Sequence, residues 1–190
     1  SVAPGGGSVS AYMGSLGAAL VTMVANLSSH KRGWDDRWEE FSDHAVKGKA
    51  IQEELLILVD EDTRAFNGIL DAFGLPKNSP QEKAARKAAI TSATLHAIRI
   101  PFRVMNNAFC GFELAEEMVL NGNPNSISDA GVGALALHAC IEGAWLNVQI
   151  NASELKDNPE VAEILKDGAG LVLNSRSSLD KILKMVNKTL

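Results

Sequence analysis

The residue best placed to do chemistry is Asp62, an acidic side chain within an apolar stripe. Apolar residues recur at i, i+3 and i+4 spacing between positions 51 and 73, as on one face of a helix: Ile51, Leu55, Leu58, Val59, Phe66, Ile69, Leu70 and Phe73. Asp62 falls on this stripe, four residues from both Leu58 and Phe66. Asp60 and Glu61 point elsewhere, because successive helical residues turn by about 100°.

A carboxylate in apolar surroundings is paired, hydrogen-bonded or protonated, because an unpartnered buried charge is costly. Such an acid can exchange a proton near neutral pH, which is the property of a general acid–base catalyst. Two interpretations of Asp62 follow. It is either a catalytic acid, or a carboxylate that caps or pairs within a bundle or reaches water at the edge of the stripe.

A second candidate is the run Gly5-Gly6-Gly7, which follows Pro4 and precedes Ser8 at the start of an apolar segment. Glycines let a ligand approach the backbone, and free N–H groups at a helix start favour an anion or a carbonyl oxygen. No lysine follows where a phosphate-binding loop requires one. An unstructured N-terminal segment is the alternative interpretation.

Three further polar sets complete the candidates. Asn147 and Asn151 are four residues apart and share a helix face, where they could orient a ligand or act as helix caps. Asp129 lies at the start of the same segment, where a plain cap with a favourable helix-dipole interaction is the simplest interpretation. Lys31 and Arg32 form a small basic pair that could meet a carboxylate or lie in solvent.

Metal and covalent chemistry are not predicted. The four histidines make no Glu-x-x-His or Cys/His spacing, so we expect no metal site. The chain lacks the Gly-x-Ser-x-Gly motif of a nucleophilic serine. Cys110 and Cys140 lie in apolar helical contexts, which indicates buried thiols rather than a disulfide, and hence a reducing, cytoplasmic compartment.

The elements that must position these residues are helices. The 190 residues, 46% hydrophobic and 22% charged, fit one domain spanning 1–190 with a core of its own. The apolar periodicity and the Gly, Pro and Asn breaks predict helices over 8–29, 35–73, 79–120, 128–151 and from Pro159 to about 187, with a kink at Pro101. We therefore predict an all-α bundle of about five long, mostly antiparallel helices.

Charge and hydropathy limit the partners. A net charge of −5 without a basic block gives no electrostatic footprint for nucleic acid. The uncharged segment 8–29 is long enough to span a bilayer, but its polar residues favour a helix buried on all sides, most easily within a homodimer. We expect no membrane insertion. Gly14 and Gly17 predict that another backbone packs closely against this helix.

Several short motifs, in order and separation, resemble the cyclodeaminase domain of formiminotransferase-cyclodeaminase over essentially the whole chain. They are Ala-Pro-Gly-Gly-Gly-Ser-Val at 3–9, Leu-Val-Asp-Glu-Asp-Thr-Arg-Ala-Phe at 58–66, Leu-Pro-Lys-Asn-Ser-Pro at 75–80 with Glu82-Lys83, Ser128-Asp129, and Leu-Asn-Val-Gln-Ile-Asn at 146–151. The resemblance implies an all-helical dimer that binds folate near the glycine run. The second aspartate of the family's Val-Asp-x-Asp-x-x-x-Phe motif is catalytic, and that position is Asp62.

The implied reaction converts 5-formiminotetrahydrofolate to 5,10-methenyltetrahydrofolate and ammonia, with no cofactor beyond tetrahydrofolate as the substrate carrier. Asp62 would take the proton of N10 and return one to the departing amine. The amides of the segment Gly5 to Ser8 would orient the pterin and the reacting carbon, together with three side chains: Asp129, Asn147 and Asn151. Lys31 and Arg32 would meet the glutamate tail, which can be polyglutamated.

Two alternatives stay open at this point. The same family contains methenyltetrahydrofolate cyclohydrolase, which opens the methenyl ring with water, and no residue separates the two activities decisively. A non-enzymatic helical dimerisation module is the other alternative, and it predicts no folate binding. Whether the site draws residues from two subunits, and whether a formiminotransferase domain is normally attached, is also left open.

Overall fold

A computed structural model describes residues 4–190, so Ala3 of the glycine-rich motif lies outside the described residues. Five long α-helices follow one another: α1 (Gly6–Ser29), α2 (Trp38–Gly74), α3 (Pro80–Asn121), α4 (Ile127–Ala152) and α5 (Pro159–Thr189). Two short 3-10 helices, η1 (Asp35–Arg37) and η2 (Pro124–Ser126), precede α2 and α4. No strand occurs within residues 4–190. The predicted all-α fold of five helices is confirmed.

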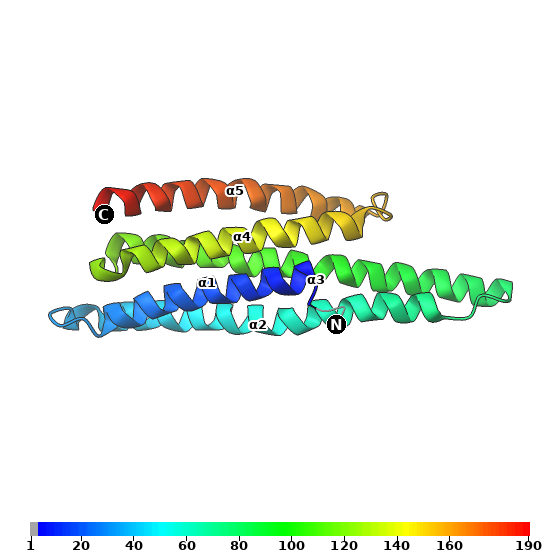
Figure 1. The fold of residues 1–190 in the computed structure, drawn as a ribbon, viewed down its shortest axis with the longest axis horizontal. Helices are drawn as coiled ribbons and strands as arrows, with labels where there is room; N and C mark the ends of the chain where they lie inside the picture. Colours follow the sequence, from blue (N-terminus) through cyan, green and yellow to red (C-terminus); the bar gives the residue numbers. More distant parts are fainter. Residues whose placement is uncertain (1–3) are drawn as a thin grey trace.

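The helices pack side by side into an elongated bundle (Figure 1). α2 and α3 form a long hairpin whose connecting loop reaches well beyond the ends of the other helices. α1 packs against both α2 and α4, and α5 covers the outer side of α4 and α3. The start of α1 therefore lies about halfway along the α2–α3 hairpin, next to the end of α4.

The helix starts follow from side-chain caps that the sequence predicts. At α3 the Ser79 hydroxyl accepts from the Glu82 amide at 3.1 Å, while the Glu82 carboxylate accepts from the Ser79 amide at 3.1 Å. This capping box, with proline next, fixes the first turn. At α5 the Asn158 side chain accepts from the amides of Glu160 and Val161, again with a proline at the first helical position.

Close contact between α1 and α4 depends on two glycines. A Cβ placed on Gly17 would lie 2.8 Å from the Gly133 carbonyl oxygen, and one on Gly133 would lie 3.1 Å from the Gly17 carbonyl oxygen. The two backbones therefore touch, as predicted from the glycines of this helix. The hydroxyls of Ser10, Thr22 and Ser28 each donate to a carbonyl four residues earlier at 2.7 Å, so this uncharged helix can be buried without unsatisfied side chains.

The chain's own fold does not bury this first helix on all sides, and the prediction of full burial relied on a homodimer. One stripe of α1 is about 37–52% exposed: Val9, Tyr12, Leu16, Met23 and Leu27. By length and composition, α1 and the segment Pro124–Ala152 could each cross a membrane, but 61% of the apolar window of α1 is buried inside the bundle. A mostly buried core helix has the same composition as a membrane span.

The apolar stripe predicted on α2 also needs correction. Leu55 and Leu58 are fully buried, but Phe66, Leu70 and Phe73 are each about half exposed. The reason is topological, since α2 runs on past the start of α1 and the end of α4 and loses its neighbours there (Figure 1). Asp62 lies near this boundary, between the closed core and the protruding hairpin.

Candidate active site

Asp62 is held by a short chain of hydroxyl groups. The Ser8 hydroxyl, buried at the start of α1, donates to Asp62 Oδ2 at 2.8 Å, and Thr63 Oγ1 lies 3.1 Å from the same Ser8 oxygen. A serine hydroxyl has a single hydrogen. Since that hydrogen is used on Asp62, the Thr63 hydroxyl donates to Ser8. The chain of bonds orients the carboxylate, which is only partly buried.

The glycine run lets α1 begin directly against this carboxylate. A Cβ on Gly7 would lie 2.1 Å from Asp62 Oδ1, and a Cβ on Gly6 would lie 3.1 Å from Asn147 Nδ2. Gly5 is the N-cap of α1 and supplies no side-chain cap. The first N–H groups of the helix therefore have no side-chain partner here and can donate to a ligand. The alternative of an unstructured segment is wrong for these described glycines.

These groups surround a pocket of about 300 Å³ at the end of α1. Its polar wall is formed by Asp62, Asn147, Asn151 and the backbone of Gly5 and Gly6. Its apolar wall comes from three side chains of α2 and α4: Phe66, Ile69 and Ile150. A concave, mostly apolar pocket with a few convergent polar groups is the usual form of a small-molecule site.

Asn151 has a structural role that uses the nitrogen of its side-chain amide. Pro101 has no N–H and leaves the carbonyl of Ala97, four residues earlier in α3, without its helical partner. The Asn151 Nδ2 donates to that Ala97 oxygen at 2.8 Å. Asn147 Nδ2 likewise donates to the Gly143 oxygen at 2.9 Å. In both side chains the amide nitrogen is engaged by the backbone, and the amide oxygen remains an acceptor beside the pocket. α3 stays helical through Pro101, with no break.

Three residues predicted for the site lie elsewhere in the chain's own fold. Lys31 and Arg32 follow the far end of α1, whose 24 residues span about 36 Å, and the Lys31 ammonium lies 3.9 Å from the centre of the Trp34 ring. Asp129 lies in the first turn of α4, about 27 Å along that helix from Asn147. The chain's own fold does not bring these three residues to the pocket, because the lengths of α1 and α4 separate them from it. Their role at the site stays a prediction.

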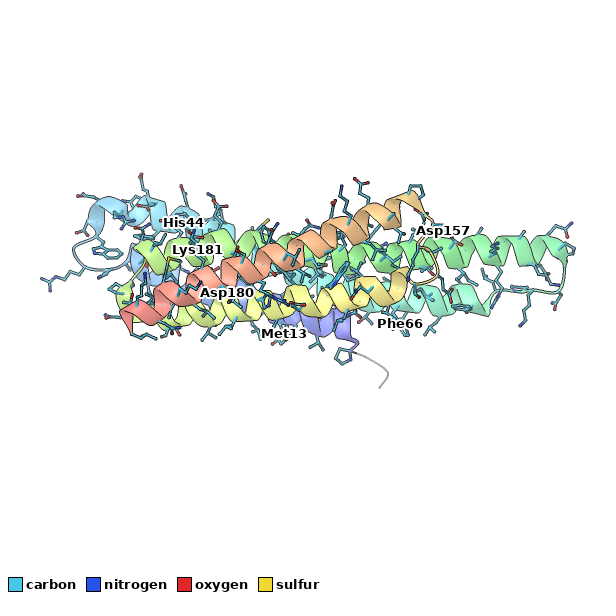
Figure 2. The ribbon with its side chains drawn as sticks, turned by 90° about the horizontal axis from the view of Figure 1, so that it is seen from above. Met13, His44, Phe66, Asp157, Asp180 and Lys181 are labelled. Atoms are coloured by element: carbon cyan, nitrogen blue, oxygen red, sulfur yellow. The ribbon has the colours of Figure 1, made fainter. Side chains whose placement is uncertain are left out.

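One group of side chains has a spacing that could hold a metal ion, although none was predicted. Within the described residues, Glu40, His44 and Glu117 offer ligand atoms within 4.8 Å of one another. Arg37 already binds the Glu40 carboxylate at 2.9 Å and 3.0 Å. Figure 2 shows His44 and the pocket residue Phe66 toward opposite ends of the bundle. The group is therefore not part of the pocket.

Sequence reasoning missed six residues of the pocket wall: Ala97 of α3, Ile150 of α4 and four residues of α2. Thr63 and Asn67 received no role, Phe66 and Ile69 were taken as core, and all four line the pocket. The available signal was their distance from Asp62, since positions one, four, five and seven residues after it lie within two turns of the same helix. Periodicity alone could not separate a pocket wall from a core face.

The arrangement supports proton transfer on a bound molecule. A single oriented carboxylate faces a pocket with amide acceptors and uncapped helix N–H groups, and an apolar wall can hold a flat ring. Fold and pocket define a class of helical-bundle proteins in which a carboxylate of the second helix lies against the start of the first helix. The crystal structure of formiminotetrahydrofolate cyclodeaminase from Thermotoga maritima has this fold, with a TM-score of 0.77 and 26% identity over 98% of this chain and 87% of that chain.

The family model described as formiminotransferase-cyclodeaminase matches residues 1–169, and the chain belongs to this family. A methenyltetrahydrofolate cyclohydrolase of Methylorubrum extorquens is 36% identical over 96% of this chain and 88% of its own length. The formimidoyltransferase-cyclodeaminase of Mus musculus is 35% identical over 83% of this chain, which spans 29% of the length of that protein. The resemblance found from the motifs is confirmed, and the chain is an enzyme of this family.

Proposed function

We propose that the protein is a formiminotetrahydrofolate cyclodeaminase, which converts 5-formiminotetrahydrofolate to 5,10-methenyltetrahydrofolate and ammonia. The observation that carries the proposal is the Asp62 carboxylate, which Ser8 holds at 2.8 Å on the wall of a pocket of about 300 Å³. The family supports the substrate class, and the relatives named as cyclodeaminases support the reaction.

The reaction needs one proton carrier and a fixed geometry. N10 of the folate attacks the formimino carbon attached to N5, forming a carbon–nitrogen bond and a tetrahedral centre. Asp62 accepts the N10 proton and returns one to the exocyclic amine. The bond from carbon to that amine breaks, ammonia leaves, and the methenyl bridge between N5 and N10 remains. Holding the two nitrogens in attack geometry supplies much of the rate.

The remaining pocket groups would bind and orient. The pterin presents donors that suit the free amide oxygens of Asn147 and Asn151, and a carbonyl oxygen that suits the N–H groups at the start of α1. Phe66 and Ile150 offer an apolar surface to the ring system. No oxidation occurs in the reaction, so tetrahydrofolate itself is the only carrier it requires. We place the enzyme in the cytoplasm because both cysteines are free thiols, although Cys110 is exposed and not buried as the sequence predicts.

Methenyltetrahydrofolate cyclohydrolase is the second candidate. The Methylorubrum extorquens relative carries that name and matches this chain over nearly its whole length. The same carboxylate would take a proton from water as the water oxygen adds to the methenyl carbon. The ring then opens, and one nitrogen keeps a formyl group. Both reactions form and collapse a tetrahedral carbon between two nitrogens, so one pocket can serve either.

A homodimer accounts for the exposed apolar face of α1 and α4. These neighbouring helices each leave a stripe exposed, and the α4 stripe consists of Val132, Leu135, Leu146 and Ile150. Exposed apolar stripes on adjacent helices are typical of an interface. Ile150 also lines the pocket, so a second copy would cover the pocket mouth and exclude water. Sedimentation tests this proposal. We expect the wild type to be a dimer and the variant Leu16→Glu to be a monomer. A monomeric wild type would contradict the proposal.

The activity test supplies each folate separately. With 5-formiminotetrahydrofolate we expect the methenyl-folate absorbance and free ammonia to rise together in equal amounts. Loss of methenyl absorbance with 5,10-methenyltetrahydrofolate, without ammonia release from the formimino compound, would assign the cyclohydrolase instead. Turnover of neither folate would contradict both proposed activities.

A further inference from the structure

Pro101 is an unusual residue for its place in the fold. It is buried in the interior of α3, a helix of 42 residues. Proline is costly inside a helix, because it has no N–H to donate and its ring crowds the carbonyl four residues earlier. The helix nevertheless continues on both sides of Pro101. A residue that breaks a local rule within an intact element is expected where a functional site requires it.

The carbonyl that Pro101 deprives of its helical donor belongs to Ala97, a buried residue that also lines the pocket. Asn151 of α4 donates from its Nδ2 to this carbonyl oxygen at 2.8 Å. A carbonyl oxygen only accepts hydrogen bonds, so the Asn151 amide must turn its nitrogen, and not its oxygen, toward α3. The amide oxygen of Asn151 is then left as an acceptor on the pocket wall.

A comparison with Asn147 shows what this bond adds. The Asn147 Nδ2 donates to the Gly143 oxygen at 2.9 Å, within α4 itself. In a helix that oxygen already accepts from the backbone N–H four residues later, so the side chain adds a second bond to a satisfied carbonyl. The Ala97 oxygen lacks its helical donor, and leaving a buried carbonyl unpaired is costly. The Asn151 amide is therefore held in one orientation more firmly than that of Asn147.

Resting on the proposed function, we infer that Pro101 is a positioning residue, which fixes the Asn151 amide so that the pocket meets the pterin with a hydrogen-bond acceptor. The carboxylate of Asp62 and the amide oxygen of Asn147 are acceptors on the same wall. A ligand edge that carries N–H donors, as the pterin does, is bound by this wall, and an edge that carries only acceptors is rejected. An amide that could turn freely would offer its nitrogen as well and would lose this selectivity.

The test is a double-mutant cycle between Pro101→Ala and Asn151→Ala, with Tm and ligand binding measured for each protein. The ligand is 5-formyltetrahydrofolate, which has an oxygen in place of the formimino nitrogen and therefore cannot release ammonia. Its Kd is measured by calorimetry. Pro80→Ala is the matched control, because Pro80 is at the start of the same helix, where a restored N–H would have no helical partner.

The Tm values test the coupling between the two residues without any ligand. Pro101→Ala should have a Tm no lower than that of Pro80→Ala, because only the former restores a helical hydrogen bond. Asn151→Ala should lower Tm in the protein that keeps Pro101. It should lower Tm less in the Pro101→Ala background, where the restored N–H satisfies the Ala97 oxygen. Equal losses in the two backgrounds would overturn the inference.

The Kd values test the consequence for the pocket. Pro101→Ala should raise the Kd about two- to tenfold, the range that one hydrogen bond contributes. It should raise the Kd no further in a protein that already carries Asn151→Ala, and Pro80→Ala should keep the wild-type Kd. An unchanged Kd in Pro101→Ala would overturn the inference, while turnover of 5-formiminotetrahydrofolate by the wild type upholds the enzyme. Coupling in Tm without folate binding or turnover by the wild type would instead refute the proposed activity.

Discussion

Replacing Gly7 by alanine is a perturbation whose effects on activity and on folding separate sharply. The new Cβ would lie 2.1 Å from Asp62 Oδ1, 2.6 Å from its Cγ and 2.8 Å from its Oδ2, all closer than the 3.0 Å that real Cβ contacts respect. The atoms it meets are the far end of one flexible side chain. The carboxylate must withdraw by about 1 Å, and a misplacement of that size costs about 100-fold in rate.

The expected kcat of Gly7→Ala is therefore about 1% of wild type, equivalent to about 2.7 kcal/mol of transition-state stabilisation. Folding should change little, because moving one carboxylate costs little and alanine gains up to about 1 kcal/mol over glycine in a helix. The assay is ammonia release under saturating folate, with Tm measured on the same samples. Gly68→Ala is the matched control, since a Cβ there meets nothing within 4 Å. If Gly7→Ala kept kcat within threefold of wild type, the position of the Asp62 carboxylate against Gly7 would not matter for catalysis.

Three further outcomes follow from the same contacts. Ser8→Ala removes the bond to Asp62 at 2.8 Å, and because a hydrogen bond to a charged group contributes about 1.5–3 kcal/mol, kcat should fall at least about tenfold in the ammonia assay. Gly17→Ala forces a Cβ to 2.8 Å from a backbone oxygen that cannot yield, so Tm should fall, whereas Gly68→Ala should raise Tm by about 2–4 °C per kcal/mol gained. Burial raises the pKa of the Cys140 thiol to about 12, so iodoacetamide at pH 8 should label the exposed Cys110 and leave Cys140 unmodified until the chain unfolds, as mass spectrometry of peptides would show.

The catalytic candidate could be predicted from the sequence because its signal is local. Asp62 lies among apolar residues at helical spacing, which predicts that its carboxylate points inward. The residues one helical turn before and after it are sufficient for this prediction. The glycine run and the asparagine pair are also local patterns. In the structure the two patterns meet, since a Cβ placed on Gly6 would lie 3.1 Å from Asn147 Nδ2.

What could not be predicted is which helix ends meet. Lys31 and Asp129 carry plausible chemistry, but the lengths of α1 and α4 place them about 27–36 Å from the pocket of their own chain. Hydropathy likewise cannot distinguish apolar residues that are buried in the core from apolar residues that stay exposed. Phe66 and Leu70 were therefore predicted as core residues, although both are half exposed.

The role of Asp62 is the central claim, and Asp62→Asn tests it most directly because asparagine keeps the shape of the side chain and can still accept the hydrogen bond from Ser8. The measurement is single-turnover ammonia release from 5-formiminotetrahydrofolate, with Tm and folate binding recorded for the same protein. We predict a loss of about 10²–10⁴-fold in rate, the usual contribution of a general acid–base group, with binding and Tm close to wild type. A variant that binds folate and releases ammonia within tenfold of the wild-type rate would remove Asp62 from the mechanism.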